Sequence, residues 1–128
     1  MRDTRFKRIE DFDASVSGNP IVWFDCHGYD YVSVQAAQYG SVSWSAAVLE
    51  LVYTNFDAGA EPRLFSATKE LTNSAPIQQS IDVGTTCIRW IGARLKTAES
   101  SVRLKIFFSA TAIPGSAVDS NDTTGKTF

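Results

Sequence analysis

The sequence predicts an all-β fold: a single antiparallel β-sandwich of the jelly-roll type, with seven or eight strands and extended terminal arms. Three observations lead to this prediction. Apolar and polar residues alternate with a period of two, most clearly over 29–37, 77–83 and 102–110. Turn residues separate the alternating stretches at short intervals. No stretch sustains the 3.6-residue period of an amphipathic helix.

The chain has the size and composition of one domain. Its 128 residues are 44% hydrophobic and 20% charged, as in a globular protein with one core. We place the sandwich at residues 21–111, an N-terminal arm at 1–20 and a C-terminal tail at 112–128. Isolated apolar residues among charged ones characterise the arm, and a turn signal at 17–20 ends it. A weak first strand is the alternative interpretation of these residues.

In the first half of the chain we expect three strands. Residues 21–24 are a short apolar run, a turn follows at 25–28, and 29–37 alternate. Serines separate the apolar residues from 42 to 48, and after Val48 the apolar positions change phase. A one-residue slip of this kind predicts either a β-bulge or burial on both faces at the end of a strand that continues to residue 53. A helix over 46–52 is the competing interpretation.

In the second half we expect a weak strand at 63–68, a strand at 77–83, and a β-hairpin. The hairpin consists of 86–96 and 101–111, joined by a polar loop, and is the clearest supersecondary element in the sequence. The apolar residues on one face of these strands should form the core. The expected core residues are Val32, Val34, Ile88, Trp90, Val102, Leu104, Ile106 and Phe108.

Charge and hydropathy exclude two classes of partner. The net charge is −2 and the isoelectric point is about 5.3, whereas duplex binding requires a concentrated positive field. The one basic cluster, in the first eight residues, is followed at once by acidic residues. No apolar run resembles a signal peptide or a membrane span. We therefore expect neither a nucleic-acid nor a membrane partner, and synthesis in a cytoplasm.

No arrangement of residues predicts catalysis, a metal site or a cofactor. One histidine, His27, cannot build a multi-histidine zinc site. We interpret the run 25–27 as a turn aspartate, a buried cysteine and an exposed histidine; a nucleophilic pair would require His27 beside Cys87. Cys26 and Cys87 are expected to be free buried thiols, with a disulfide as the alternative. The sequence therefore predicts a protein that is not an enzyme.

The aromatic residues permit two interpretations. Three tryptophans and four tyrosines could line a sugar-binding face. We interpret Trp44 and Trp90 as core residues, and Tyr29 and Tyr31 as residues of a partly exposed sheet face, where tyrosine serves protein interfaces as well as sugar sites. Phe107 lies opposite the clean apolar face of its strand, which indicates an interface.

The stretches 28–35, 41–51, 80–83 and 87–90 share a pattern of short strands and turns. In this pattern, over about residues 20–111, the chain resembles β-sandwich modules of small virion proteins of tailed bacteriophages, as found in head decoration (cement) proteins and in fibre bases. The resemblance implies a structural role, no cofactor, and self-association, with a trimer as the implied oligomer.

The resemblance gives two functional hypotheses. The first is a capsid decoration protein that stabilises the phage head by binding the major capsid protein, or other virion proteins, through its arms; it would reside in the virion, assembled in the host cytoplasm. The alternative is a carbohydrate- or receptor-binding module of a phage tail or fibre, with a glycan as ligand. The residues expected to contact partners or other subunits are Arg2, Arg5, Phe6, Arg8, Tyr29, Tyr31, Phe107, Val118 and Phe128.

Overall fold

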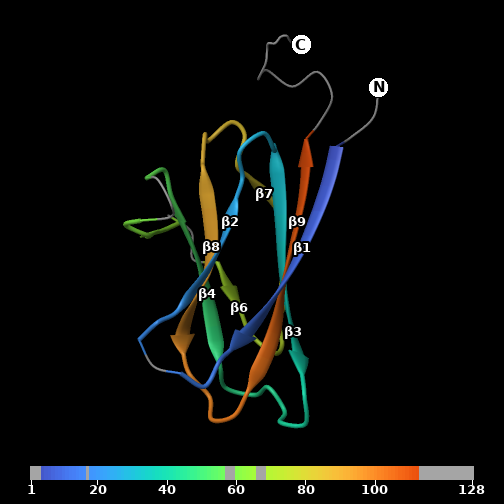
Figure 1. Cartoon of the computed structure of the whole chain (residues 1–128), viewed down its shortest axis with the longest axis vertical. Helices are drawn as coiled ribbons and strands as arrows, with labels where there is room; N and C mark the ends of the chain where they lie inside the picture. Colours follow the sequence, from blue (N-terminus) through green and yellow to red (C-terminus); the bar gives the residue numbers. More distant parts are fainter. Residues whose placement is uncertain (1–3, 17, 57–59, 66–68, 113–128) are drawn as a thin grey trace.

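The structure is a computed structural model that describes residues 4–16, 18–56, 60–65 and 69–112 (Figure 1). All regular secondary structure in these residues is β, and no helix occurs among them. The described residues accordingly contain no helix that is long and apolar enough to cross a membrane. The strands are β1 (Thr4–Asp13), β2 (Ile21–Asp25), β3 (Tyr31–Tyr39), β4 (Val48–Thr54), β5 (Arg63–Leu64), β6 (Glu70–Leu71), β7 (Ile77–Asp82), β8 (Trp90–Thr97) and β9 (Arg103–Ala112).

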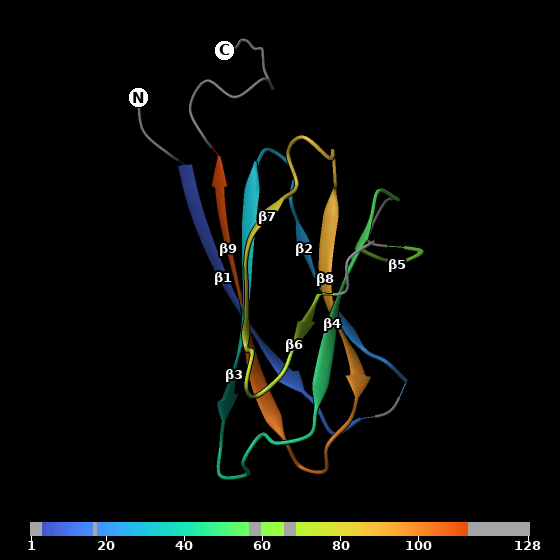
Figure 2. The same ribbon diagram turned by 180° about the vertical axis from the view of Figure 1, so that it is seen from behind.

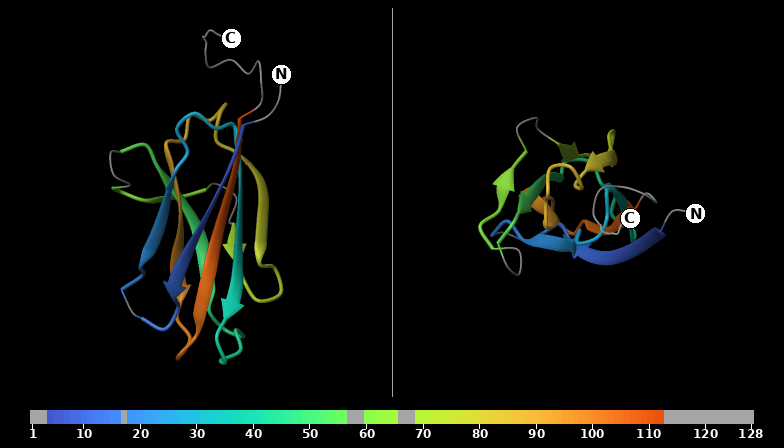
Figure 3. Two further views of the ribbon diagram at one scale, coloured as in Figure 1. Left: turned by 45° about the vertical axis from the view of Figure 1, so that its right-hand side comes forward. Right: turned by 90° about the horizontal axis from the view of Figure 1, so that it is seen from above.

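The strands form two sheets that face each other. One has the order β1-β9-β3-β7, and the other has the order β2-β8-β4-β5 with β6 also paired to β4. Each pairing is antiparallel. Figures 1 and 2 show the two layers from opposite sides, and Figure 3 shows them from above. The prediction of an antiparallel β-sandwich is confirmed.

The core lies between the sheets, where period-two alternation places it. The inward residues of β3 and β9 are almost fully buried, among them Val34, Leu104, Ile106 and Phe108, each 0% exposed. Across the sandwich, the Phe24 ring stacks on the Phe108 ring with centroids 5.2 Å apart. The expected core residues are therefore confirmed, with one exception.

That exception is Trp90, which is only half-buried. Along β8 the inward residues are Ile91, Ala93 and Leu95, so Trp90 shares the outer face with Gly92. The sequence places apolar residues on both phases of this stretch, and the pattern alone did not show which phase faces the core.

The predicted hairpin of 86–96 and 101–111 is wrong. β8 belongs to the five-stranded sheet and β9 to the four-stranded sheet, so their connection crosses the sandwich as an arch. Alternation specifies which face of a strand is buried, but not which strand lies beside it. The arch is held by backbone bonds of its own: the Glu99 N–H donates to the Ala14 carbonyl at 2.9 Å, and the Val102 N–H donates to the Glu99 carbonyl at 3.2 Å.

Two strands, β4 and β8, begin at least four residues later than predicted. β4 starts at Val48, because the N–H groups of residues 45–47 donate to a side-chain carboxylate rather than to a strand. The predicted β-bulge is present, as a register shift between Val48 and Leu49, and the competing helix is not. β8 starts at Trp90, and Cys87 before it has a positive φ of 57°, which a strand does not accommodate.

The N-terminal residues correct the predicted domain boundaries. Residues 4–13, assigned to an arm, form β1 and pair with β9 over their whole length. Phe12 is 7% exposed and Ala14 0%, so these apolar residues anchor the segment in the core. The weak-strand interpretation is therefore the correct one for 4–13. The C-terminal tail after Ala112 lies outside the described residues.

Candidate interaction surface

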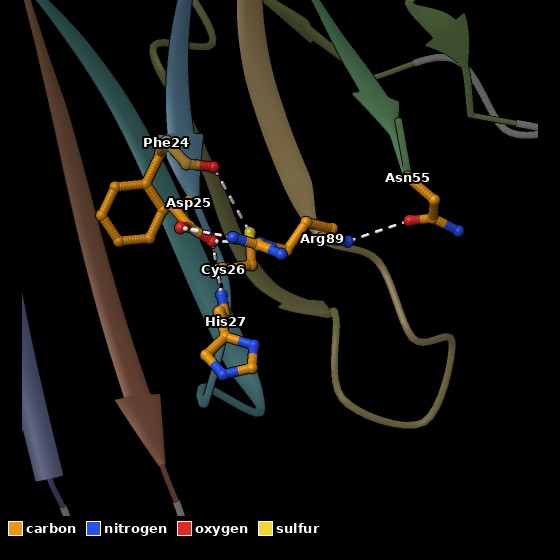
Figure 4. Close-up of polar contacts among 6 residues, drawn as sticks. All are labelled: Phe24, Asp25, Cys26, His27, Asn55 and Arg89. Atoms are coloured by element: carbon orange, nitrogen blue, oxygen red, sulfur yellow. Dashed lines mark hydrogen bonds and ion pairs between the residues drawn. The ribbon is translucent and has the colours of Figure 1, made fainter. Parts of the chain in front are cut away.

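The run Asp25-Cys26-His27 lies at one end of the sandwich, where hydrogen bonds to the Asp25 carboxylate hold it in place (Figure 4). Arg89 donates to the Asp25 carboxylate twice, Nε to Oδ1 at 2.8 Å and Nη2 to Oδ2 at 3.3 Å. The His27 backbone N–H donates to Asp25 Oδ1 at 2.9 Å. The hydrogen bonds from Arg89 lower the pKa of Asp25 below its ordinary value, against the opposing effect of burial. The ion pair ties the end of β2 to the segment that leads into β8.

The chemistry of this run is that of a packed turn. Cys26 is buried, and burial raises the pKa of its thiol to about 12, so the thiol stays protonated and is a poor nucleophile or metal ligand. His27 is exposed. Within the described residues, no three histidine, cysteine or acidic side chains could together hold a metal ion. The buried cysteine and the exposed histidine are confirmed, whereas Asp25 is the last residue of β2 rather than a turn residue.

The second cysteine differs from the prediction. Cys87 is a free thiol but exposed, because it lies in the loop before β8 rather than within the strand. It lines the same surface hollow as His27, yet no hydrogen bond between the two is present in the described part of the chain. The disulfide alternative is not formed, since both cysteines are free.

An apolar row crosses the outer face of the β1-β9-β3-β7 sheet. Paired residues of adjacent strands project from the same face, and the register aligns Ile9 with Phe107, Phe107 with Gln35, and Gln35 with Ile77. Ile9 is 57% exposed and Ile77 is 40% exposed. Tyr31, 38% exposed, lies on this same face. We call Ile9, Phe107 and Ile77 the apolar row, in which the polar Gln35 lies between Phe107 and Ile77. Apolar side chains gathered on a solvent-facing sheet indicate an interaction site.

Charged and aromatic residues border the apolar row. Lys105 Nζ donates to Asp11 Oδ1 at 2.9 Å and lies 4.8 Å from the centroid of the Tyr39 ring. The hydrogen bond from Lys105 to Asp11 raises the pKa of the lysine. A shallow hollow beside the row is lined by Ser33, Ser109 and residues of the row itself. An apolar centre with a polar rim is the usual anatomy of a protein interface.

The structure describes the side chains of four predicted contact residues: Tyr29, Tyr31, Phe107 and Arg8, the last of which lines a shallow hollow together with Phe107. Tyr31 and Phe107 share the outer face, whereas Tyr29 packs against Phe24 with ring centroids 6.1 Å apart. Arg8 is exposed in β1 and ion-paired with Glu10. Arg5 and Phe6 belong to β1, but their side chains lie outside the description. Arg2, Val118 and Phe128 also lie outside the described residues.

Sequence analysis missed Ile9 and Ile77 as surface residues. Ile9 is one of the isolated apolar residues of the predicted N-terminal arm, but in a strand it lies on the face opposite Phe12 and Ala14 and therefore points outward. The alternation over 77–83 predicts that Ile77 and Ile81 share a face, but the pairing of β7 with β3 shifts register between them. Ser80 takes a positive φ of 55° at that irregularity, so the phase changes.

The outer face of the other sheet carries two half-buried tryptophans. Trp23 is paired with Gly92 across β2 and β8, and a methyl group on Gly92 would lie 2.8 Å from the Trp23 ring. Trp90 lies under the Arg89 guanidinium, 5.5 Å from the ring centroid. Among the described residues, the buried Trp90 Nε1 has no hydrogen-bond partner.

Comparison with solved structures shows a structural likeness. No family model matches the chain, and no curated protein matches it. The crystal structure of SPBc2 prophage-derived protein YomS superposes with a TM-score of 0.53, covering 84% of this chain and 96% of that one, at 8% sequence identity. At that identity the likeness shows a shared sandwich fold.

Proposed function

We propose that the chain is a structural protein of a phage particle, and that the outer face of its β1-β9-β3-β7 sheet contacts a neighbouring virion protein. The apolar row carries this proposal. A solved structure with the same fold is that of a prophage-derived protein, and nearly the whole of that protein superposes on this domain. The fold likeness and the resemblance in strand pattern favour the same class of protein.

The apolar row has the chemistry of a contact surface. Burying an isoleucine or phenylalanine side chain completely contributes about 1.5–3 kcal/mol, and Ile9 and Ile77 keep much of their area exposed in the single chain. The Lys105–Asp11 ion pair at the border would contribute more to orientation than to affinity.

The specific role that we propose is decoration of the phage head, with the major capsid protein as partner. The strand β1 is part of the sandwich, so attachment through the sheet face replaces the attachment through an N-terminal arm that the sequence suggested. The proposed location is the virion, and the chain is proposed to self-associate there.

Particle binding by face variants tests this function. A tagged chain is added to particles of the phage that encodes it, and the fraction that co-sediments is measured. Phe107→Asp should lower that fraction at least about tenfold, because an unpaired charge would be buried in the contact. Phe56→Asp, at an exposed phenylalanine away from this face, is the control. Wild-type protein that stays in the free fraction would contradict the function, and equal loss in both variants would contradict the surface.

A second candidate function is carbohydrate binding by a tail or fibre module. The observation in its favour is the pair Trp23 and Trp90 on the outer face of β2 and β8, because an aromatic face can stack against a sugar ring. A glycan array with wild-type protein and with Trp23→Ala tests it. Binding that Trp23→Ala removes would favour this function, and an array without signal would exclude it for the glycans present.

A further inference from the structure

β1 is a long edge strand with one open side. It has ten residues and borders the four-stranded sheet (Figures 1 and 2), and no other described strand pairs with its outer side. Just after β1, the Ala14 N–H donates to the carbonyl of Val102, the residue before β9, at 3.0 Å. The backbone groups of even-numbered residues therefore face β9. Backbone groups alternate in direction along a strand, so the N–H and C=O groups of odd-numbered β1 residues face the open side. An edge of this length is a template for a further strand.

The charges of β1 are arranged for pairing with itself. The first half of the strand is basic and the second half is acidic, and Ile9 stands between them. The basic residues are Arg5, Lys7 and Arg8, and the acidic residues are Glu10, Asp11 and Asp13. Two such strands running antiparallel set the basic half of each beside the acidic half of the other.

We propose that two copies of this chain associate by antiparallel pairing of β1 with β1, with the two-fold axis at Ile9. Ile9 then faces Ile9 of the second copy. Going outward from the axis, the register sets Arg8 opposite Glu10, Lys7 opposite Asp11, and Arg5 opposite Asp13. Each opposite-charge pair occurs twice, because a two-fold contact is isologous.

Neighbouring registers lack this complementarity. An axis at residue 8 sets Arg8 opposite Arg8, and an axis at residue 10 sets Glu10 opposite Glu10; like charges directly opposite each other are destabilising. An axis between two residues would set core-side positions opposite outer-face positions and break the continuity of the sheet faces. The register centred on Ile9 is therefore the one that the charges select.

The described side chains fit this register. Arg8 and Glu10 already form an ion pair within one chain, with 45% and 32% of their side chains exposed. In the pair of strands, the two arginines and two glutamates alternate around the axis. Ile9, 57% exposed, would contact its own copy on the outer face.

Pairing of β1 with β1 would make a dimer, an assembly that the proposed function does not specify. It joins two four-stranded sheets edge to edge and makes the apolar rows of both copies continuous. It also closes at two subunits, which gives a dimer rather than the trimer that the resemblance implied. The dimer does not depend on any particle, so its tests and the particle-binding test can fail separately.

Disulfide trapping tests the position of the axis. Residues opposite each other in a hydrogen-bonded antiparallel pair have Cα atoms about 5.5 Å apart, within the range of a disulfide. Ile9→Cys is made with Cys87→Ser, which removes the exposed native thiol, and is mildly oxidised at micromolar concentration. We expect a cross-linked dimer as the main product. Leu64→Cys in the same background, with exposure of 55% at the native residue, is the control, and equal cross-linking of the two would overturn the proposal.

Charge reversal tests the register in uncross-linked protein. Sedimentation velocity on the full chain should show a dimer whose dissociation constant rises roughly tenfold or more in Arg8→Glu and in Glu10→Arg, since each substitution acts twice. The double variant Arg8→Glu/Glu10→Arg restores opposite charges and should restore the dimer. Circular dichroism confirms that each variant is folded.

Two results would overturn the proposal. One is a double variant that remains as weakly associated as the single variants. The other is a full-length wild-type chain that stays monomeric, including a chain that dimerises only when residues 113–128 are removed.

Discussion

The Glu99 carboxylate accepts the backbone N–H of Ser45 at 2.9 Å, although 54 residues separate the two in sequence. The same carboxylate accepts the N–H groups of Ala46 at 2.7 Å and Ala47 at 3.0 Å, and the Ser45 hydroxyl. One side chain thus holds the loop before β4 against the arch between β8 and β9. These hydrogen bonds, led by the Ser45 hydroxyl, lower the pKa of Glu99 to about 2.

The Glu99 contact should give stability a defined pH dependence. A carboxyl whose pKa is lower in the folded state than in the unfolded state stabilises the fold above the unfolded pKa. That stabilisation should be complete above about 4.5 and be lost as the pH falls toward about 2. Urea melts should show wild type and Glu99→Gln differing most at neutral pH and converging in this window.

The control for the Glu99 prediction is Glu61→Gln, at an exposed glutamate whose side chain has no hydrogen bond in the described structure. Asp13, Asp25 and Asp82 also have lowered pKa values. The pH dependence of wild-type stability alone therefore does not identify Glu99 as its source. If the free energies of unfolding of wild type and Glu99→Gln differ by the same amount from pH 2 to pH 7, the predicted role of Glu99 is wrong.

Leu104→Ala should be strongly destabilising. Leu104 is 0% exposed, and removal of its side chain leaves a cavity between the sheets, so the free energy of unfolding should fall by about 2–5 kcal/mol. The matched control is Leu64→Ala at a 55% exposed leucine, which should change it by less than about 0.5 kcal/mol. Similar values for the two variants would show that the core is assigned wrongly.

Gly92→Ala should destabilise by overpacking. The added methyl group would lie 2.8 Å from both Ile21 Cγ2 and Trp23 Cε3, closer than van der Waals contact, and the expected cost is about 1–3 kcal/mol. Making the substitution in a Trp23→Leu background should reduce that cost, because the ring is then gone. An unchanged melting temperature in Gly92→Ala would show that Trp23 does not cover Gly92.

The two cysteines should differ in reactivity. Cys87 is exposed, whereas Cys26 is buried and its thiol pKa is raised to about 12; only a thiolate reacts rapidly with thiol reagents. In the native protein at pH 8, a chromogenic disulfide reagent should modify one thiol rapidly and the second only after urea is added. Mass spectrometry assigns the first to Cys87. Rapid modification of two thiols in native protein would contradict the burial of Cys26.

The sequence predicted the fold class because alternation reports directly which residues are buried. The same pattern does not report sheet membership: β8 and β9 follow one another across a short polar loop, as the strands of a hairpin do, yet they lie in different sheets. The strand β1 was obscured because its charges at Arg8, Glu10 and Asp11 resemble a solvated arm, although Phe12 already marks its buried face.

The candidate surface could be predicted only in part. Phe107 and Tyr31 were identified because they lie opposite clean core faces in their own strands. Ile9 and Ile77 join them through register, a long-range property that depends on the pairing of β9 with β1 and of β3 with β7. The irregularity at Ser80, which turns Ile77 outward, has no signal in the sequence pattern.

The central claim is that the outer face of the β1-β9-β3-β7 sheet is a contact surface in a phage particle. Hydroxyl-radical footprinting tests this claim most directly, by comparing the free chain with the chain in purified particles. Mass spectrometry measures the oxidation rate of each residue. We predict that Tyr31, Ile77 and Phe107 are protected in the particle, whereas Phe56 and Leu64, exposed elsewhere, react as in the free chain. Equal oxidation of Tyr31, Ile77 and Phe107 in both samples would contradict the claim.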